Sequence, residues 1–209
     1  MIVGGSVLND WESKGHCYGE CMSSPNSDLM YVYIPKNASS WTKPNLQDFG
    51  WEFYNYHHDK INKHAIVVLR DPLDRWLSGI AEYLTLYHPD FELKSSETIE
   101  LIFDRLTFDD HTERQVKFIS GLDTNNCTFF YCDDSYRHNF SKFFEERYGP
   151  NSYFKYDYQH VSENSPERRK FKSIFGKLIS ENQQYYYKIK NYFKHDYELI
   201  DQVKFYDAR

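Results

Sequence analysis

Three stretches of the chain are apolar at nearly every position. They are Leu29–Ile34 (LMYVYI), Ala65–Leu69 (AIVVL) and, less strongly, Thr128–Tyr131 (TFFY). Strands of this kind are typical of a sheet that is covered on both faces. Because these runs alternate with helical patterns, the sequence predicts an α/β fold with a short parallel sheet flanked by helices.

The clearest helical pattern follows the second apolar stretch. Asp71 is a natural N-cap, Pro72 suits the first helical position, and Asp74 suits the first turn. Apolar residues then recur every three or four positions, at Leu73, Trp76, Leu77, Ile80, Ala81 and Leu84. This spacing gives one apolar stripe on a helix. Other helices are predicted at about 96–106, 111–120, 139–147 and 166–193, so the C-terminal half is expected to be mainly helical.

The organisation of the chain is simple. A length of 209 residues fits one domain, and neither an internal repeat nor a low-complexity tract interrupts it. Residues 1–28 are polar and poorly periodic, which indicates an irregular lead-in. We therefore predict a single domain over residues 1–209.

Charge and composition exclude several classes of function. The net charge is −6, whereas broad nucleic-acid binding needs a basic face. No window approaches the ~20 apolar residues of a membrane span, and the first residues do not form a secretory signal. We expect a soluble, cytoplasmic protein with no nucleic-acid or membrane partner, although a local anion site stays possible.

The cysteines and the aromatic residues each leave an alternative open. The pairs Cys17/Cys21 and Cys127/Cys132 have C-x3-C and C-x4-C spacing, unlike the C-x2-C knuckles of structural zinc sites. Free thiols in a reducing compartment fit this spacing better. Aromatic residues make up 19% of the chain, with 19 Tyr and 16 Phe. Either codon bias in an AT-rich genome or an aromatic-lined cleft for sugars or rings explains this richness.

The segment after the first predicted strand, residues 35–41 (PKNASSW), has the features of an anion-binding loop. Small residues let consecutive backbone N–H groups surround an anion. The next helix adds the positive end of its dipole, and Lys36 adds a mobile charge. The segment is not a nucleoside-triphosphate P-loop, which needs G-x-x-x-x-G-K-[ST]. The alternative is an ordinary strand-to-helix turn with a serine N-cap.

Two motifs in this region resemble those of the PAPS-dependent sulfotransferases, which use 3′-phosphoadenosine 5′-phosphosulfate (PAPS) as sulfuryl donor. PKNASSW resembles their phosphosulfate-binding loop, P-K-S-G-T-T-W. RDPLDRWLS (70–78) resembles their 3′-phosphate motif, R-[DN]-P-x-x-R-x-x-S, and the RDPLERLLS of Golgi carbohydrate sulfotransferases. The clear resemblance covers about residues 31–84. Weaker echoes of the family are Asp110-His111 with Gln115, His160-Val161 with Asn164-Ser165, and Asp196–Ile200 (DYELI).

The resemblance implies a P-loop-like sulfotransferase fold with its donor-binding core at residues 29–84 and no metal. The side of PAPS that carries the 5′-phosphosulfate would be held by Lys36, Asn37, Ala38, Ser39, Ser40 and Trp41. Arg70 and Ser78 would grip the 3′-phosphate. Lys36 would also neutralise the bridging oxygen as the product PAP leaves, and Trp41 would pack near the adenine.

Each donor-site residue has a structural alternative when it is taken singly. Arg70 could form a salt bridge to Asp71 or Asp74, and Ser78 could simply face solvent. Three departures from the family pattern also matter. Ala38 replaces the usual glycine, Pro44 limits or kinks the helix after the loop, and the R-K-G segment of the cytosolic members is absent. Either phosphate contacts or a solvated helix face would account for Arg168, Arg169 and Lys170.

The general base is harder to place. His58 is the first candidate and His57 the second, because Tyr54–Asp59 (YNYHHD) resembles the Y-H-G-H stretch of uronyl 2-O-sulfotransferases. A neighbouring carboxylate would orient the ring. His111 and Glu82 are the reserves, and a capping role is an equal alternative for His111.

The resemblance implies transfer of the sulfuryl group from PAPS to a hydroxyl. A carbohydrate is the preferred acceptor because of RDPLDRWLS, the DYELI ending and the aromatic richness, while small-molecule and tyrosine acceptors stay open. No membrane anchor is evident, unlike in the Golgi enzymes, which suggests a bacterial or viral (phage-like) protein. Regiochemistry and oligomeric state are not indicated. The alternatives are a non-catalytic module that binds PAP or another nucleotide, and a nucleotide-dependent phosphotransferase, which the lack of a Walker pattern disfavours.

Overall fold

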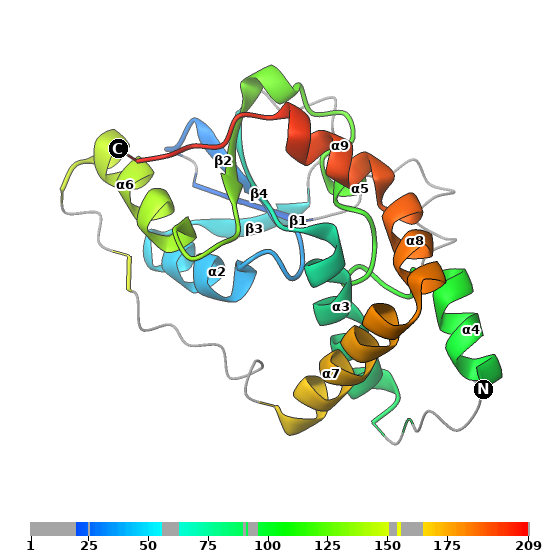
Figure 1. Cartoon of the computed structure of the whole chain (residues 1–209). Coiled ribbons are helices and arrows are strands. Elements are labelled where there is room, and N and C mark those ends of the chain that lie inside the picture. Colours follow the sequence, from blue (N-terminus) through cyan, green and yellow to red (C-terminus); the bar gives the residue numbers. More distant parts are fainter. Residues whose placement is uncertain are drawn as a thin grey trace. The chain divides into compact units, whose positions relative to one another are not determined.

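The computed structural model describes residues 20–24, 26–55, 63–89, 91, 96–150, 154–155 and 165–208 (Figure 1). The chain divides into two compact units. The sheet unit consists of Cys17–Arg70, Gln115–His160 and Ile200–Arg209. The helical unit consists of Met1–His16, Asp71–Arg114 and Val161–Leu199. The chain therefore passes from one unit to the other directly after Arg70, within the predicted donor-binding core, and the single domain over 1–209 stays a prediction.

The sheet unit contains a five-stranded mixed sheet with the order β3-β1-β2-β4-β5. Its strands are β1 (Glu20–Ser23), β2 (Leu29–Val32), β3 (Glu52–Asn55), β4 (His64–Leu69) and β5 (Cys127–Tyr131). β2, β4 and β5 are parallel, whereas β1 is antiparallel to both β2 and β3. The α/β class and the three predicted strands are confirmed. The predicted parallel sheet is wrong in part, because β1 and β3 extend it with antiparallel pairs. The irregular lead-in is wrong over Glu20–Ser23, because these four residues are too few to show a strand period and gain their structure by pairing.

The core of the sheet unit lies between one face of the sheet and two helices. α2 (Ser39–Asp48) and α6 (Tyr136–Tyr148) supply Trp41, Leu46, Phe140 and Phe144, and the strands supply Tyr31, Ile66, Val68 and Phe130. Met30, Val32 and Val67 alternate with these strand residues and are buried as well. The central strands are thus covered on both faces, as their apolar runs predict. At the outer edge of β5, Phe205 forms a parallel bridge with Phe129.

The helical unit is built on α3 (Pro72–Tyr87). Around it lie α4 (Ser96–Arg105), α7 (Pro166–Glu181), α8 (Gln183–Tyr192) and the start of α9 (Lys194–Gln202), with α3 in contact with α7, and α8 in contact with both α7 and α4. Trp76, Ile80, Phe103, Phe175 and Ile189 are central to its core. The amphipathic stripe predicted from Leu73 to Leu84 therefore forms the buried face of α3.

Two helix predictions need correction. A single helix over 166–193 is wrong, because Asn182 is extended and its side chain accepts a hydrogen bond from the Gln184 N–H at 2.9 Å, which starts α8. The helix predicted over 111–120 is reduced to α5 (Gln115–Phe118). A short 3₁₀ helix, η2 (Thr124–Asn126), precedes β5. Within the described residues no helix has the length and apolar character needed to cross a bilayer.

Candidate functional site

The loop between β2 and α2 presents backbone donors that no described backbone acceptor uses. Lys36 and Ala38 both have positive φ, 69° and 55°, a conformation that costs an L-residue roughly 1–2 kcal/mol. Helix α2 has no side-chain cap, and the N–H groups of Ala38, Ser39 and Ser40 have no backbone acceptor among the described residues. Successive N–H groups at a helix N-terminus form a cradle for an anion. The loop therefore fits a phosphate or sulfate group, although it lacks glycine.

Arg70 follows β4 and closes this loop from the neighbouring strand. β2 and β4 are parallel, so their carboxyl ends lie at the same edge of the sheet, where α/β proteins bind ligands. The Arg70 Nη1 donates to the Lys36 carbonyl at 3.0 Å. Arg70 forms no ion pair with a described residue, so a structural salt bridge, the alternative reading of this residue, is not observed.

Gln115 and Asn37 fix the backbone of both loops. The Gln115 Oε1 accepts from the Arg70 N–H at 3.0 Å, and its Nε2 donates to the Arg70 carbonyl at 2.9 Å. The fully buried Asn37 donates to this same Oε1 at 2.6 Å and to the Val68 carbonyl at 2.7 Å. The sequence marks Gln115 only as a weak family echo, and its clamping role is visible only in the structure.

Trp41 belongs to the core of the sheet unit. Its side chain is 2% exposed, and its Nε1 donates to the Lys155 carbonyl at 3.0 Å. The ring makes edge-to-face contacts with Tyr136 and Phe140. Trp41 thus anchors the start of α2, and contact with an adenine would require this packed ring to move.

Ser78 lies in the helical unit, about two turns into α3. Its Oγ donates to the Asp74 carbonyl at 2.9 Å, a bond that a hydroxyl can exchange for a ligand oxygen by rotating about χ1. The helix begins at the predicted cap, because the Asp71 carboxylate accepts from the Asp74 N–H at 2.9 Å.

Arg168 behaves differently from its two basic neighbours. Arg169 and Lys170 are exposed, as expected of a solvated face. Arg168 is mostly buried and pairs through Nη2 with Glu82 of α3 at 2.8 Å. Its Nε and Nη1 are shielded from solvent and have no hydrogen-bond partner among the described residues. Glu82 is one helical turn beyond Ser78, so both side chains lie on one face of α3. The interpretation as a solvated face is therefore wrong for Arg168.

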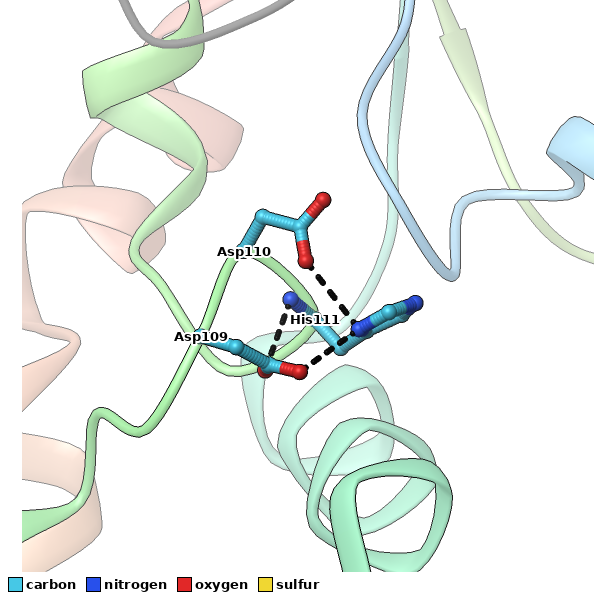
Figure 2. Close-up of side chains that lie close together, drawn as sticks. All are labelled: Asp109, Asp110 and His111. Carbon is cyan, nitrogen blue, oxygen red and sulfur yellow. Dashed lines mark hydrogen bonds and ion pairs between the residues drawn. The ribbon is translucent and has the colours of Figure 1, made fainter. Parts of the chain in front are cut away.

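The segment before α5 forms a tight turn that holds a histidine between two carboxylates (Figure 2). The His111 Nδ1 is 2.8 Å from Asp109 Oδ2 and 3.1 Å from Asp110 Oδ1. The second carboxylate oxygen of Asp109 accepts from the His111 backbone N–H at 3.0 Å. The Thr112 hydroxyl accepts from the Phe108 N–H at 2.8 Å. These hydrogen bonds from side chains to the backbone stabilise a turn at 108–112 in place of a first helical turn, and α5 starts only at Gln115.

This turn is fastened to α3 by two residues of the RDPLDRWLS motif. The buried Arg75 donates to the carbonyl oxygens of Glu113 and Asp110. Gly79, one turn further, faces the backbone of His111 so closely that an added Cβ would lie 2.7 Å from the His111 carbonyl carbon. The sequence assigns no role to Arg75 or Gly79, and both roles depend on a contact made more than thirty residues along the chain.

The electrostatics of the turn favour a charged imidazole. Burial lowers the pKa of His111, but hydrogen bonds to Asp109 and Asp110 and the charges of both carboxylates raise it to about 9. Burial likewise lowers the pKa of Arg75 to about 10, against the opposing charge of Asp196 and other carboxylates. Asp196, the first residue of DYELI, is buried, so this echo of the family has a structural role here. Asp109, Asp110 and His111 are also residue types that ligate metals, but here a proton on Nδ1 already joins the two carboxylates.

The remaining residues singled out in the sequence are two histidines, the segment around His160 and the four cysteines. His57 and His58 lie outside the described residues, as do His160, Val161 and Asn164. Among the cysteines, Cys21, Cys127 and Cys132 are free thiols, and burial raises the pKa of Cys127 to about 11. Cys17 is outside the described residues.

Comparisons with known proteins do not assign the chain to a family. No protein-family model, curated protein or solved structure matches the chain. The functional argument therefore rests on the motifs and on the geometry described above.

Proposed function

We propose that the chain is a PAPS-dependent sulfotransferase with a P-loop-like sulfotransferase fold, and that it sulfates a hydroxyl of a carbohydrate. The observation that carries this proposal is the pair of loops at the carboxyl edge of β2 and β4. One loop offers the N–H groups of residues 38–40, which have no backbone acceptor among the described residues, and Arg70 of the other is fixed beside it through Lys36 and Gln115. The two sequence motifs that resemble the family coincide with these two loops.

The residues have distinct tasks in this proposal. The N–H groups of Ala38, Ser39 and Ser40 hold the 5′-phosphosulfate, and the Lys36 ammonium neutralises the charge on its bridging oxygen. Arg70 and Ser78 bind the 3′-phosphate. When bound, PAPS supplies an activated sulfuryl group on a stable leaving group, so that the protein mainly positions the reactants and stabilises charge.

Two further assignments follow from the sequence and the helical unit. Arg168 adds a phosphate contact beside Ser78 in the helical unit, because two of its N–H groups lack partners among the described residues and its partner Glu82 shares a helix face with Ser78. His58 or His57 acts as general base in the interpretation from sequence. The carbohydrate acceptor is supported by the RDPLDRWLS and DYELI segments alone.

Calorimetric titration with PAP tests the donor site. We expect micromolar PAP binding and no binding of ATP. Lys36→Ala and Arg70→Ala should each weaken PAP binding by about 10- to 100-fold, because each removes a charge-assisted hydrogen bond worth roughly 1.5–3 kcal/mol.

Arg147→Ala is the matched control. It removes an exposed arginine of α6 that pairs with Asp28 at 2.7 Å, and PAP binding should stay unchanged. A folded protein that ignores PAP would disprove the donor site. PAP binding without transfer of the sulfuryl group from PAPS to the hydroxyl of any acceptor in a panel of glycosides would instead identify a non-catalytic binding module.

A further inference from the structure

The loop between β2 and α2 has a strained backbone, and side chains of the same unit hold it in place. Lys36 and Ala38 both have positive φ, a conformation that lysine and alanine rarely adopt. Thr42 donates to the Ala38 carbonyl at 3.0 Å, and Arg70 donates to the Lys36 carbonyl at 3.0 Å. Strain of this kind persists only where neighbouring groups fix the backbone, and it is concentrated at functional sites. These contacts therefore hold the loop in its conformation before a ligand binds.

Arg70 can hold the loop and bind a phosphate at the same time. One guanidinium group has five N–H donors. Its Nη1 makes the bond to Lys36, whereas Nε and Nη2 make no hydrogen bond to any residue that the structure describes. The side chain is only half-buried, so it can contact a ligand without leaving the loop.

Gln115 in turn holds Arg70. Its fully buried side chain pairs with the N–H and the carbonyl of Arg70, at 3.0 and 2.9 Å, and accepts from Asn37 Nδ2 at 2.6 Å. Gln115 thus connects the residue after β4 with the loop after β2. The Asn37 Oδ1 is buried without a partner among the described residues, a cost to stability of a kind that proteins tolerate at functional sites.

We propose that Arg70 and Gln115 are positioning residues of the 5′-phosphosulfate loop, and that the loop and the 3′-phosphate position are coupled through the Arg70 guanidinium. This inference rests on the proposed function. A 3′-phosphate on Nε and Nη2 immobilises the guanidinium, which then holds the Lys36 carbonyl more firmly. By linkage, a group bound in the loop strengthens binding of the 3′-phosphate by the same factor. All the residues involved belong to the sheet unit.

A nucleotide without a 3′-phosphate separates the two roles of Arg70. Adenosine 5′-monophosphate (AMP) has the 5′-phosphate of PAP but lacks the group that Arg70 is proposed to bind. If Arg70 served the 3′-phosphate alone, its removal would leave AMP affinity unchanged. Because Arg70 also holds the loop, its removal should weaken AMP binding as well.

The test is calorimetric titration with PAP and with AMP, the latter up to about 10 mM so that millimolar dissociation constants are measured. Arg70→Ala should weaken AMP binding by about 3- to 10-fold, the effect of one lost hydrogen bond, and PAP binding by a larger factor. The loss of AMP affinity should persist in about 0.5 M sodium chloride, which screens the removed charge. Gln115→Met changes no charge and should weaken AMP binding by a similar factor.

Asn139→Leu is the matched control. Asn139 is another buried amide of the sheet unit, and it accepts from the Ala208 N–H at 3.3 Å and donates to Ser135 Oγ at 3.2 Å. Its removal should leave both affinities unchanged, although it also costs stability. Circular dichroism shows which variants are folded. If Gln115→Met does not fold, Arg70→Ala at high salt decides, because it removes only a half-buried side chain.

Three results would overturn the inference. One is an AMP affinity that Arg70→Ala leaves unchanged at high salt, and another is an equal loss of affinity in Asn139→Leu. The third is a wild-type protein that binds PAP but not AMP, because the loop would then not be held ready without a 3′-phosphate. A folded wild-type protein that binds neither nucleotide would instead reject the proposed function itself.

Discussion

At the scale of single residues, the site depends on side chains that bind backbone rather than ligand. Gln115 makes two hydrogen bonds to the backbone of Arg70, and Asn37 joins it from the first loop. Arg75 has the same kind of role on the turn of His111. Each of these side chains is buried, so a loss of its bonds would leave unpaired polar groups that cost about 1–3 kcal/mol.

Gly79→Ala tests the close approach of the His111 turn to α3. A methyl group at this position would overlap the His111 backbone, so we expect the free energy of unfolding to fall by about 1–3 kcal/mol. Urea denaturation measures this change.

Gly176→Ala is the comparison, because Gly176 lies inside α7 with no atom within 4 Å of an added Cβ. Alanine there should raise the free energy of unfolding by about 0.5–1 kcal/mol. Equal changes for the two variants would contradict the contact between Gly79 and His111.

At the scale of elements, capping side chains decide where the helices of the helical unit begin. Asp71 caps α3, Ser165 caps α7 and Asn182 caps α8. The caps before Pro72 and Pro166 can be read from the sequence because proline fits the first helical position. No proline follows Asn182, so the sequence does not signal a new helix there. Its neighbours Gln183–Tyr187 continue the apolar spacing, which explains the incorrect single helix.

Asp71→Ala tests the cap of α3. Loss of the bond from its carboxylate to the Asp74 N–H should lower the free energy of unfolding by about 1 kcal/mol, whereas Asp71→Ser should retain most of the stability. Thermal unfolding followed by circular dichroism compares the three proteins. If serine destabilises as much as alanine does, the role of Asp71 is not that of a cap.

At the scale of the whole molecule, ionisable groups whose pKa differs between the folded and unfolded states make the free energy of unfolding depend on pH. The raised pKa of His111 means that the folded protein binds a proton which the unfolded chain, with a pKa of 6.5 at this residue, releases earlier. Stability from this group is therefore complete below pH 6.5 and is lost as the pH rises to about 9. Cys127 adds a further loss above pH 9, because its thiol ionises more easily in the unfolded chain.

A comparison of the wild-type protein with His111→Gln isolates the histidine. The difference in their free energies of unfolding should be largest at pH 6 and should shrink by on the order of 3 kcal/mol between pH 6.5 and 9. Urea titrations at four pH values measure it. A difference that stays constant with pH would show that Asp109 and Asp110 do not hold the imidazole in its charged form.

The sequence by itself determined the elements whose signals are local. Leu29–Val32 and His64–Leu69 form strands covered on both faces because their side chains are apolar at nearly every position. The loop at 35–41 and the helix after Asp71 follow from small residues, a cap and a proline at adjacent positions. Each of these signals is contained within a few residues, so no distant partner is needed to read it.

Tertiary structure decided what depends on partners far along the chain. β1 and β3 are strands because they pair with each other, and β1 also pairs with β2. Gln115 reaches Asn37 across 78 positions, and the turn of His111 is fixed by Arg75 and Gly79. No local period encodes these pairings, because they exist only after the chain has folded back on itself. For the same reason the sequence predicts that the loops after β2 and β4 follow parallel strands, as they do, but it does not show which side chains hold them.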